Sequence, residues 1–148
     1  MHIKCVIDSS SLISLVKADL DDYLELTGWK FVTVQDVFNE VVNLGLQKGF
    51  LDALKSKKLF DAGVITVVAI NKNNLPTDLQ VIALAQDLQA NLLANDVKLG
   101  RIALSKCLTV LGSVDLCFFL KEKKIRMRNI LGLVVVLICV AIALFVGR

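Results

Sequence analysis

Four acidic residues fall in four separate segments of this 148-residue chain, each beside an apolar run or within a helical pattern. They are Asp8, Glu40, Asp78 and Asp96. Carboxylates that converge in a fold repel one another, and this repulsion raises their pKa values. A hard divalent cation such as Mg²⁺ or Mn²⁺ relieves the repulsion because it takes oxygen ligands. The four acidic residues are therefore candidate ligands of a metal ion.

Each of these carboxylates also has an ordinary structural interpretation. Asp8 can cap a turn, and Asp96 can be the N-cap of a helix. Asp78 can complement the dipole of the helix that it opens, and Glu40 can be a solvated helix residue. Their spacing alone leaves both interpretations open. Asp8 fits the structural interpretation least well, because it directly follows the apolar run 5–7.

The apolar pattern predicts strands that alternate with helices. Five β-prone runs predict strands at 2–8, 29–34, 64–70, 91–94 and 108–111. Helical spacing predicts helices over 12–16, 20–26, 36–44, 50–60, 78–89 and 95–106 and one from 113 onward, with Asp36, Thr77 and Ser113 as N-caps. Such alternation predicts an α/β fold, with a doubly wound, Rossmann-like parallel sheet of about five strands. The run 64–70 is typical of a strand buried on both faces.

This fold would bring the acidic residues together. In a doubly wound sheet, ligands bind outside the carboxyl ends of the strands. Asp8 ends the first predicted strand, and Asp96 follows the fourth. Asp78 lies in the first turn of the helix that leads into the fourth strand, and Glu40 lies on the helix after the second. The sequence therefore predicts that the four carboxylates meet at one edge of the sheet.

Several stretches resemble PIN-domain proteins. VIDSSSLISL (6–15) resembles the opening of that family, and VFNEVV (37–42) resembles its second motif, with Glu40 in the acidic position. PTDLQVIALAQDLQANLLAND (76–96) resembles the third and fourth motifs, and LTVLGSVDLCFFLKEKKI (108–125) resembles the last strand and helix. The resemblance covers about residues 3–125, and we expect one PIN-like domain over 1–125.

The resemblance implies a Mg²⁺- or Mn²⁺-dependent endoribonuclease, a hydrolase that cleaves phosphodiesters of single-stranded RNA. The four acidic residues match the catalytic and metal-binding positions, and Ser10 and Asn95 match supporting positions. The third motif resembles most the subgroup that trims small-subunit ribosomal RNA. The implied role is RNA processing, or that of a toxin held by an antitoxin protein. Homodimers are common in the resembling family.

Other residues carry weaker signals. Lys98 and Arg101 lie one helical turn apart and either contact RNA phosphate or form a solvated helix face. Tyr23 and Trp29 could stack on bases, although packing within the protein is the favoured interpretation. The four Cys have no C-x-x-C spacing and the chain holds one His, so neither a structural zinc site nor a disulfide framework is expected.

The C-terminal segment has a different composition. The mean hydropathy of the chain, +0.67, is high for a soluble domain, and 16 of the 19 residues 129–147 are apolar. Nineteen helical residues span about 28 Å, close to the hydrocarbon thickness of a bilayer. The preceding KEKKIRMR (121–128) is basic, and basic flanks stay in the cytoplasm. We therefore expect 126–148 to be a basic flank and single transmembrane anchor, with the N-terminal domain cytoplasmic; a buried core helix is the alternative.

The charge separates in the same way. Residues 1–120 have a net charge of −2 and residues 121–148 one of +5, so the positive balance of the chain comes from its C-terminal part and says nothing about nucleic acid. The first hypothesis is a membrane-anchored PIN-type endoribonuclease. The second is a catalytically silent PIN-like module that binds RNA or protein at the membrane. A phospho-receiver domain is disfavoured, because the run 64–70 is followed by Asn71 where that class needs Asp.

Overall fold

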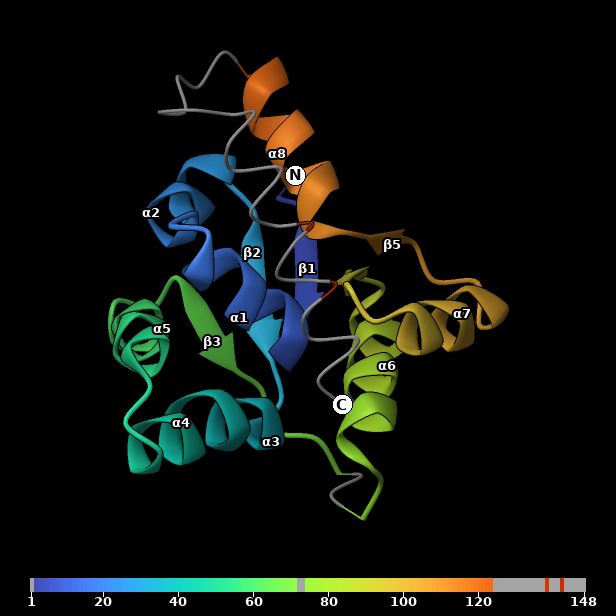
Figure 1. Cartoon of the computed structure of the whole chain (residues 1–148). Coiled ribbons are helices and arrows are strands. Elements are labelled where there is room, and N and C mark those ends of the chain that lie inside the picture. Colours follow the sequence, from blue (N-terminus) through green and yellow to red (C-terminus); the bar gives the residue numbers. More distant parts are fainter. Residues whose placement is uncertain (1, 72–73, 124–137, 139–141, 143–148) are drawn as a thin grey trace.

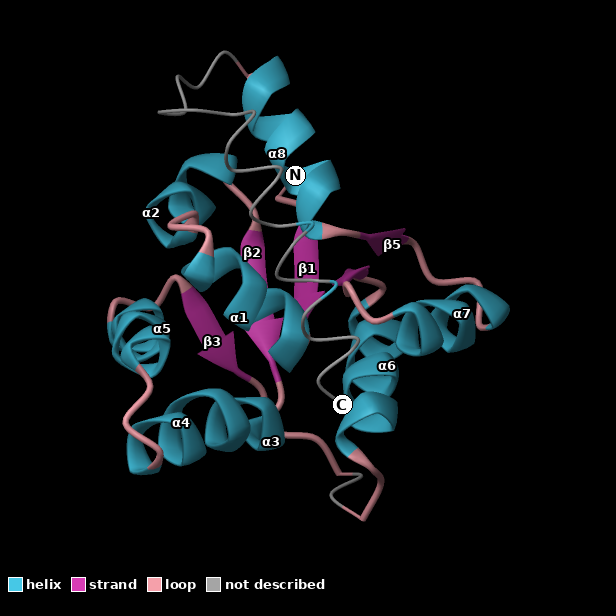
Figure 2. Ribbon diagram, viewed as in Figure 1, coloured by secondary structure: helices cyan, strands magenta, loops and turns pink. Residues whose placement is uncertain are grey.

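Parallel strands form the centre of the protein. The computed structural model describes residues 2–71 and 74–123, together with Ile138 and Ile142 (Figure 1). In this part of the chain one sheet has the strand order β3-β2-β1-β4-β5, and every pairing is parallel (Figure 2). The strands are β1 (Lys4–Ile7), β2 (Lys30–Thr33), β3 (Ile65–Val67), β4 (Asn91–Leu93) and β5 (Val110–Leu111). Each lies within a predicted strand, so the predicted α/β fold with five parallel strands is confirmed.

Helical segments connect each strand to the next. The bounds are α1 (Ser9–Lys17), α2 (Asp21–Leu24), the 3-10 turn η1 (Glu25–Thr27), α3 (Gln35–Phe38), the π-helical turn η2 (Asn39–Leu44), α4 (Gly45–Gln47), α5 (Leu51–Asp61), α6 (Thr77–Leu88), α7 (Val97–Ser105) and α8 (Ser113–Glu122). Three segments, α3, η2 and α4, follow one another without a break. The helix predicted over 36–44 is therefore longer than expected and contains a π-helical turn.

Three of the predicted N-cap residues lie inside their helices. Two of these side chains bond to other segments: Asp36 accepts a hydrogen bond from Gln80, and Ser113 accepts one from Asn95. The N-cap positions are held by Val34, Pro76 and Gly112, where Asp36, Thr77 and Ser113 were predicted.

The strand order creates a switch point beside β1. The chain proceeds from β1 to β2 and β3 on one side, and then crosses to place β4 and β5 on the other. Ile7 of β1 is aligned with Leu93 of β4, and the Asp8 N–H donates to the Leu93 carbonyl at 3.3 Å. Connections therefore leave the carboxyl ends of β1 and β4 in opposite directions, which opens a crevice at their junction.

Burial follows the position of each strand in the sheet. Cys5, Val6 and Ile7 of the central strand β1 are fully buried, as expected for a parallel strand covered on both faces. The prediction that 64–70 is buried on both faces is wrong. Its strand β3 lies at the edge of the sheet, so Thr66 and Val67 are exposed.

Gly45 allows α4 and α5 to pack closely against each other. A Cβ placed on Gly45 would lie 2.7 Å from the Ala53 Cβ, so only glycine allows α4 to approach α5 this closely. The helix that carries Glu40 is thereby held against α5, which in turn packs on α1. This packing fixes the position of η2 relative to the carboxyl edge of the sheet.

The predicted membrane span at 129–147 lies outside the described residues, except for Ile138 and Ile142. Within the part that is described, none of the helices has the length and apolar character needed to cross a bilayer.

Candidate active site at the carboxyl edge of the sheet

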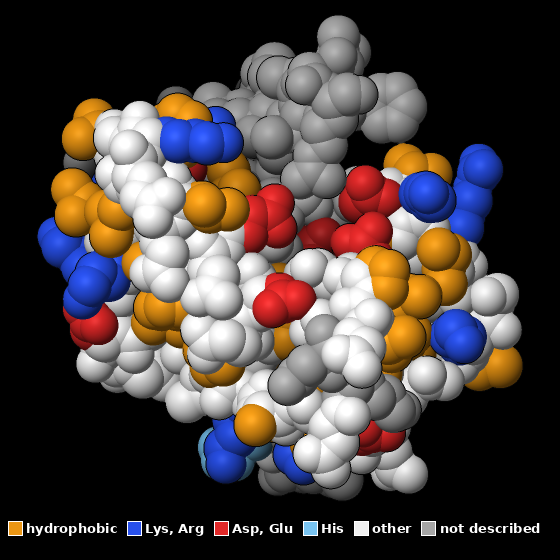
Figure 3. Space-filling model, turned by 90° about the horizontal axis from the view of Figure 1, so that it is seen from below, with side chains coloured by type: hydrophobic (Ala, Val, Ile, Leu, Met, Phe, Trp, Pro, Cys, Tyr) orange, Lys and Arg blue, Asp and Glu red, His pale blue; other side chains and the backbone are white. Residues whose placement is uncertain are grey.

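A small pocket opens outside the ends of β1 and β4. Figure 3 views this edge of the molecule from below and shows Asp and Glu side chains gathered near the middle of the face. All four carboxylates singled out from the sequence line the pocket, although they come from four separate segments. The lining residues are Asp8, Ser9, Ser10, Val37, Glu40, Thr77, Asp78, Val81 and Asp96.

Asp8 forms the floor of the pocket and is 5% exposed. It is the N-cap of α1, and its Oδ1 accepts a hydrogen bond from the Ser11 N–H at 2.9 Å. Its Oδ2 accepts a hydrogen bond from Ser10 Oγ at 2.8 Å. The structural and the functional interpretations of Asp8 are therefore compatible, because each carboxylate oxygen can accept more than one bond.

The surroundings of Asp8 oppose its ionisation. Burial raises the pKa of Asp8 above its ordinary value; the hydrogen bonds from Ser11 and Ser10 act against this, and the negative charge of Asp78 adds to it. Asp78 is exposed at the mouth, in the first turn of α6. The fold thus keeps a buried carboxylate beside a second negative charge, an arrangement that a bound cation would stabilise.

Glu40 lies at the mouth of the pocket, in the π-helical turn η2. One of its oxygens, Oε2, accepts a hydrogen bond from Ser9 Oγ at 2.7 Å. A π-helical turn contains an extra residue, which changes the direction of the side chains that follow, and such turns are frequent at functional sites. The contact with Ser9 ties this turn to the start of α1.

Asp96 and Asn95 follow β4 and have different roles. Asp96 lines the pocket and is the N-cap of α7, where its Oδ1 accepts a hydrogen bond from the Leu99 N–H at 2.8 Å. Asn95 connects elements around the site: its N–H donates to Ser11 Oγ at 2.9 Å. Its side chain donates to Ser113 Oγ at 2.8 Å and accepts from the Ser113 N–H at 2.9 Å. Asn95 thus holds β4 against α1 and α8.

Gln80 was not singled out from the sequence. It lies outside the pocket lining and connects α6 to α3 and to the loop before α6. Its Nε2 donates to Asp36 Oδ2 at 2.6 Å and to the Leu75 carbonyl at 2.8 Å, and the residue is 3% exposed. These bonds hold the start of α6, which carries Asp78, against α3. The available signal was a single amide within the otherwise apolar run of this helix. Ser9 was also not singled out, and Thr77 was predicted only as an N-cap.

The remaining predicted contacts lie away from the pocket. Lys98 and Arg101 are exposed on α7, and the structure does not bring either into the pocket lining. Trp29 packs against Phe119, with ring centroids 4.6 Å apart, and Tyr23 packs on the core. Packing was the favoured interpretation of both aromatic residues, and it is confirmed.

Comparison with known proteins gives the family. A family model described as "DUF3368: PIN domain" matches residues 4–138. The chain belongs to the PIN-domain family. Its sequence matches no curated protein. A PilT N-terminus domain protein from the hyperthermophilic archaeon Sulfolobus solfataricus P2 has a similar structure, with a TM-score of 0.50 and 21% identity, over 77% of this chain and 90% of that one. This likeness supports the PIN-like fold.

Membership of the PIN-domain family indicates a nuclease-type function in general, and PIN-domain nucleases typically use a divalent metal ion. The pocket suits such an ion in chemistry and size. Its polar lining presents carboxylate and hydroxyl oxygens, the donors that Mg²⁺ and Mn²⁺ prefer. Its volume of about 30 Å³ has room for about two water-sized species, such as an ion and one water, and is too small for a base.

The carboxylates are not drawn together as a compact cluster. Among the described residues, no three of the types His, Cys, Asp and Glu lie close enough to hold a metal ion as placed. Helix caps and the Ser9 contact hold Asp8, Asp96 and Glu40 at the pocket wall. For a cation to be held by several of these carboxylates, their side chains would have to rotate toward it.

Proposed function

We propose that this PIN domain is a Mg²⁺- or Mn²⁺-dependent endoribonuclease that hydrolyses phosphodiesters of single-stranded RNA. One observation carries the proposal: Asp8, Glu40, Asp78 and Asp96 line a single pocket at the switch point of the sheet. A buried carboxylate beside a like charge is costly in the absence of a cation, so its presence supports a metal-binding role.

The residues of the pocket would have different roles according to their position in it. Asp8 and Asp96, held by their helix caps, would bind the ion from the sheet side, and Asp78 would bind it from the mouth. When bound, the cation supplies a water of lowered pKa and neutralises charge on the phosphate. Glu40, oriented by Ser9, would take the proton from that water as general base.

A cleavage assay with matched variants tests the proposal. The full-length protein, kept in detergent because of its apolar C-terminal segment, is incubated with Mn²⁺ and an end-labelled single-stranded RNA. Asp96→Asn should abolish cleavage while keeping the helix, since Asn caps helices about as well as Asp. Asp61→Asn, on the exposed surface of α5, should cleave like the unaltered protein. Cleavage that survives Asp96→Asn would refute the assignment.

A silent binding module is the alternative. It is favoured by the separation of the carboxylates, which do not form a compact metal cluster among the residues described. Such a module would bind RNA or a protein without cleaving it. Saturable Mn²⁺ binding that depends on the acidic residues would argue against this alternative.

The cellular setting is proposed from the sequence. Residues 129–147 would anchor the enzyme in a membrane, with the domain on the cytoplasmic side. Recovery of the full-length protein in the carbonate-washed membrane pellet would support the anchor, and release into the supernatant would reject it. A toxin role would require an antitoxin protein, whereas a processing enzyme would act without one. Homodimer formation and RNA contacts by Lys98 and Arg101 belong to the same proposal.

A further inference from the structure

A second groove lies at the opposite edge of the sheet, where the strands begin. Its volume is about 600 Å³, far larger than that of the acidic pocket and within the usual range for sites that hold a small organic ligand. Among the described residues that line it, none is acidic. The lining residues are His2, Ile3, Lys4, Lys30, Leu88, Gln89 and Asn91.

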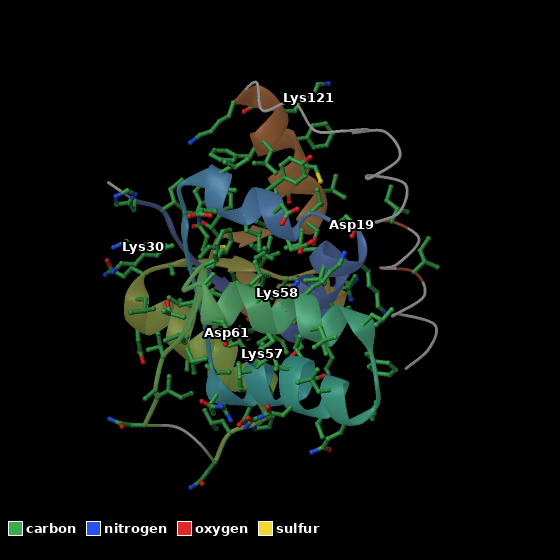
Figure 4. The ribbon with its side chains drawn as sticks, turned by 90° about the vertical axis from the view of Figure 1, so that its left-hand side faces the viewer. Asp19, Lys30, Lys57, Lys58, Asp61 and Lys121 are labelled. Atoms are coloured by element: carbon green, nitrogen blue, oxygen red, sulfur yellow. The ribbon has the colours of Figure 1, made fainter. Side chains whose placement is uncertain are left out.

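Two lysines stand side by side in this groove. Lys4 of β1 and Lys30 of β2 are aligned partners in the sheet register, and both are exposed. Figure 4 shows Lys30 projecting from the margin of the molecule. Like charges on aligned residues of neighbouring strands repel each other and destabilise the sheet. An anion bound between the two ammonium groups would remove this repulsion.

The other residues that line the groove supply amide groups for hydrogen bonding and apolar surface. Gln89 ends α6 in the left-handed conformation, with φ 49°, and the chain then turns into β4 at Asn91. Both amides line the groove. Ile3 and Leu88 add aliphatic surface to the same lining. The groove therefore combines cations, amides and apolar side chains in one site.

We propose that this groove binds a phosphate-bearing nucleoside unit, either within an RNA strand or as a free nucleotide. Lys4 and Lys30 would bind the phosphate as point charges. The amides of Gln89 and Asn91 would bond the base edge, and the aliphatic wall would contact the sugar or base. The choice of RNA as the natural source rests on the proposed function.

The groove is separate from the proposed active site. Lys4 and Asp8 lie at opposite ends of β1, about 13 Å apart at the usual rise of a strand. RNA held at Lys4 and Lys30 is therefore bound outside the cleavage pocket. Contacts of this kind position a strand and strengthen its binding without taking part in the reaction.

Fluorescence anisotropy tests the groove apart from catalysis. The full-length protein in detergent is titrated with an end-labelled, short single-stranded RNA in EDTA, which prevents cleavage. The double variant Lys4→Gln/Lys30→Gln should weaken binding about tenfold or more. It should also lower the slope of log affinity against log salt by about 1.4, or about 0.7 for each phosphate contact removed. Thermal unfolding followed by circular dichroism checks that the variants are folded.

Matched lysines on another surface provide the control. Lys57→Gln/Lys58→Gln removes two charges from α5, where Figure 4 shows both residues, and should leave the salt slope unchanged. Equal weakening by the two double variants would overturn the proposal, since binding would then depend only on overall charge. Displacement of the RNA by polyglutamate at an equal concentration of charge would overturn it as well.

Two further measurements complete the test. Displacement of RNA by a mononucleotide would identify the free nucleotide as a ligand, whereas binding of RNA alone would identify the strand as the source; both support the groove. Asp96→Asn, which should abolish cleavage, should not weaken RNA binding in EDTA, because it removes a negative charge. The groove and the proposed function can therefore fail independently, because one is measured by binding without metal and the other by cleavage.

Discussion

Ser9 Oγ donates a hydrogen bond to Glu40 Oε2 at 2.7 Å, joining two residues 31 positions apart in the chain. Ser9 is the first residue of α1, and Glu40 lies in the π-helical turn η2. The bond holds a carboxylate at the mouth of the pocket in one orientation. Ser9 is therefore a positioning residue for Glu40 in the proposed reaction.

Removal of this hydroxyl should impair the reaction more than substrate binding. We expect Ser9→Ala to lower kcat about tenfold or more, because a misplaced catalytic group is costly. KM should change little, since the site of RNA binding is preserved. Ser105→Ala, which removes an exposed hydroxyl at the end of α7, is the control and should not change either constant. A drop in protein stability without any change in kcat would assign Ser9 a structural role only.

Gln80 should contribute to stability through its buried amide. Gln80→Leu keeps the size of the side chain but leaves Asp36 Oδ2 and the Leu75 carbonyl without this donor. We expect a loss of about 1–3 kcal/mol in the free energy of unfolding, measured with urea. Gln86→Leu, on the exposed surface of the same helix, should change it by less than about 0.5 kcal/mol. Equal effects of the two substitutions would contradict the role given to Gln80.

Asp8 should make stability depend on pH. Burial raises the pKa of Asp8 in the folded protein above its ordinary value of 3.8. The folded state thus favours the protonated form, and its stability falls as the pH rises from 3.8 through the raised pKa. In EDTA, Asp8→Asn should therefore be more stable than the unaltered protein at neutral pH, with a smaller difference near pH 4. A difference of constant size in urea unfolding from acid to neutral pH would contradict this.

Asn95 should matter for the fold as well as for the site. Asn95→Ala removes both side-chain bonds to Ser113, which hold the end of β4 against α8. We expect a loss of about 1–3 kcal/mol in unfolding free energy, because partly buried partners lose their bonds. Asn43→Ala, which removes an exposed bond to Asn39, should have little effect. Similar unfolding midpoints for Asn95→Ala and the unaltered protein would show that this connection is dispensable.

The sequence predicts most of the sheet and the convergence of the carboxylates. Apolar runs locate the five strands, and the rule that ligands bind at carboxyl ends places Asp8 and Asp96 together. The order of the strands is not encoded in any local pattern, which is why β3 was expected to be buried and is an edge strand. The roles of the four carboxylates in catalysis and metal binding stay predictions.

Other features depend on contacts between distant residues. The π-helical turn that carries Glu40 has the apolar pattern of an ordinary helix. One extra residue barely changes the spacing of apolar positions in a short segment, so the pattern does not reveal the turn. The bond between Gln80 and Asp36 joins residues 44 positions apart, and it also explains why Asp36 is not an N-cap. Such a bond depends on how the fold brings the two segments together and has no signature in either segment alone.

Calorimetric titration with Mn²⁺ tests the central claim most directly. If the carboxylates of this pocket form a metal site, the full-length protein should bind Mn²⁺ saturably. Asp96→Asn should weaken that binding about tenfold or more, and Asp61→Asn should not change it. Absence of saturable binding in the unaltered protein, or equal binding by the Asp96→Asn variant, would contradict the assignment of this pocket as a metal centre.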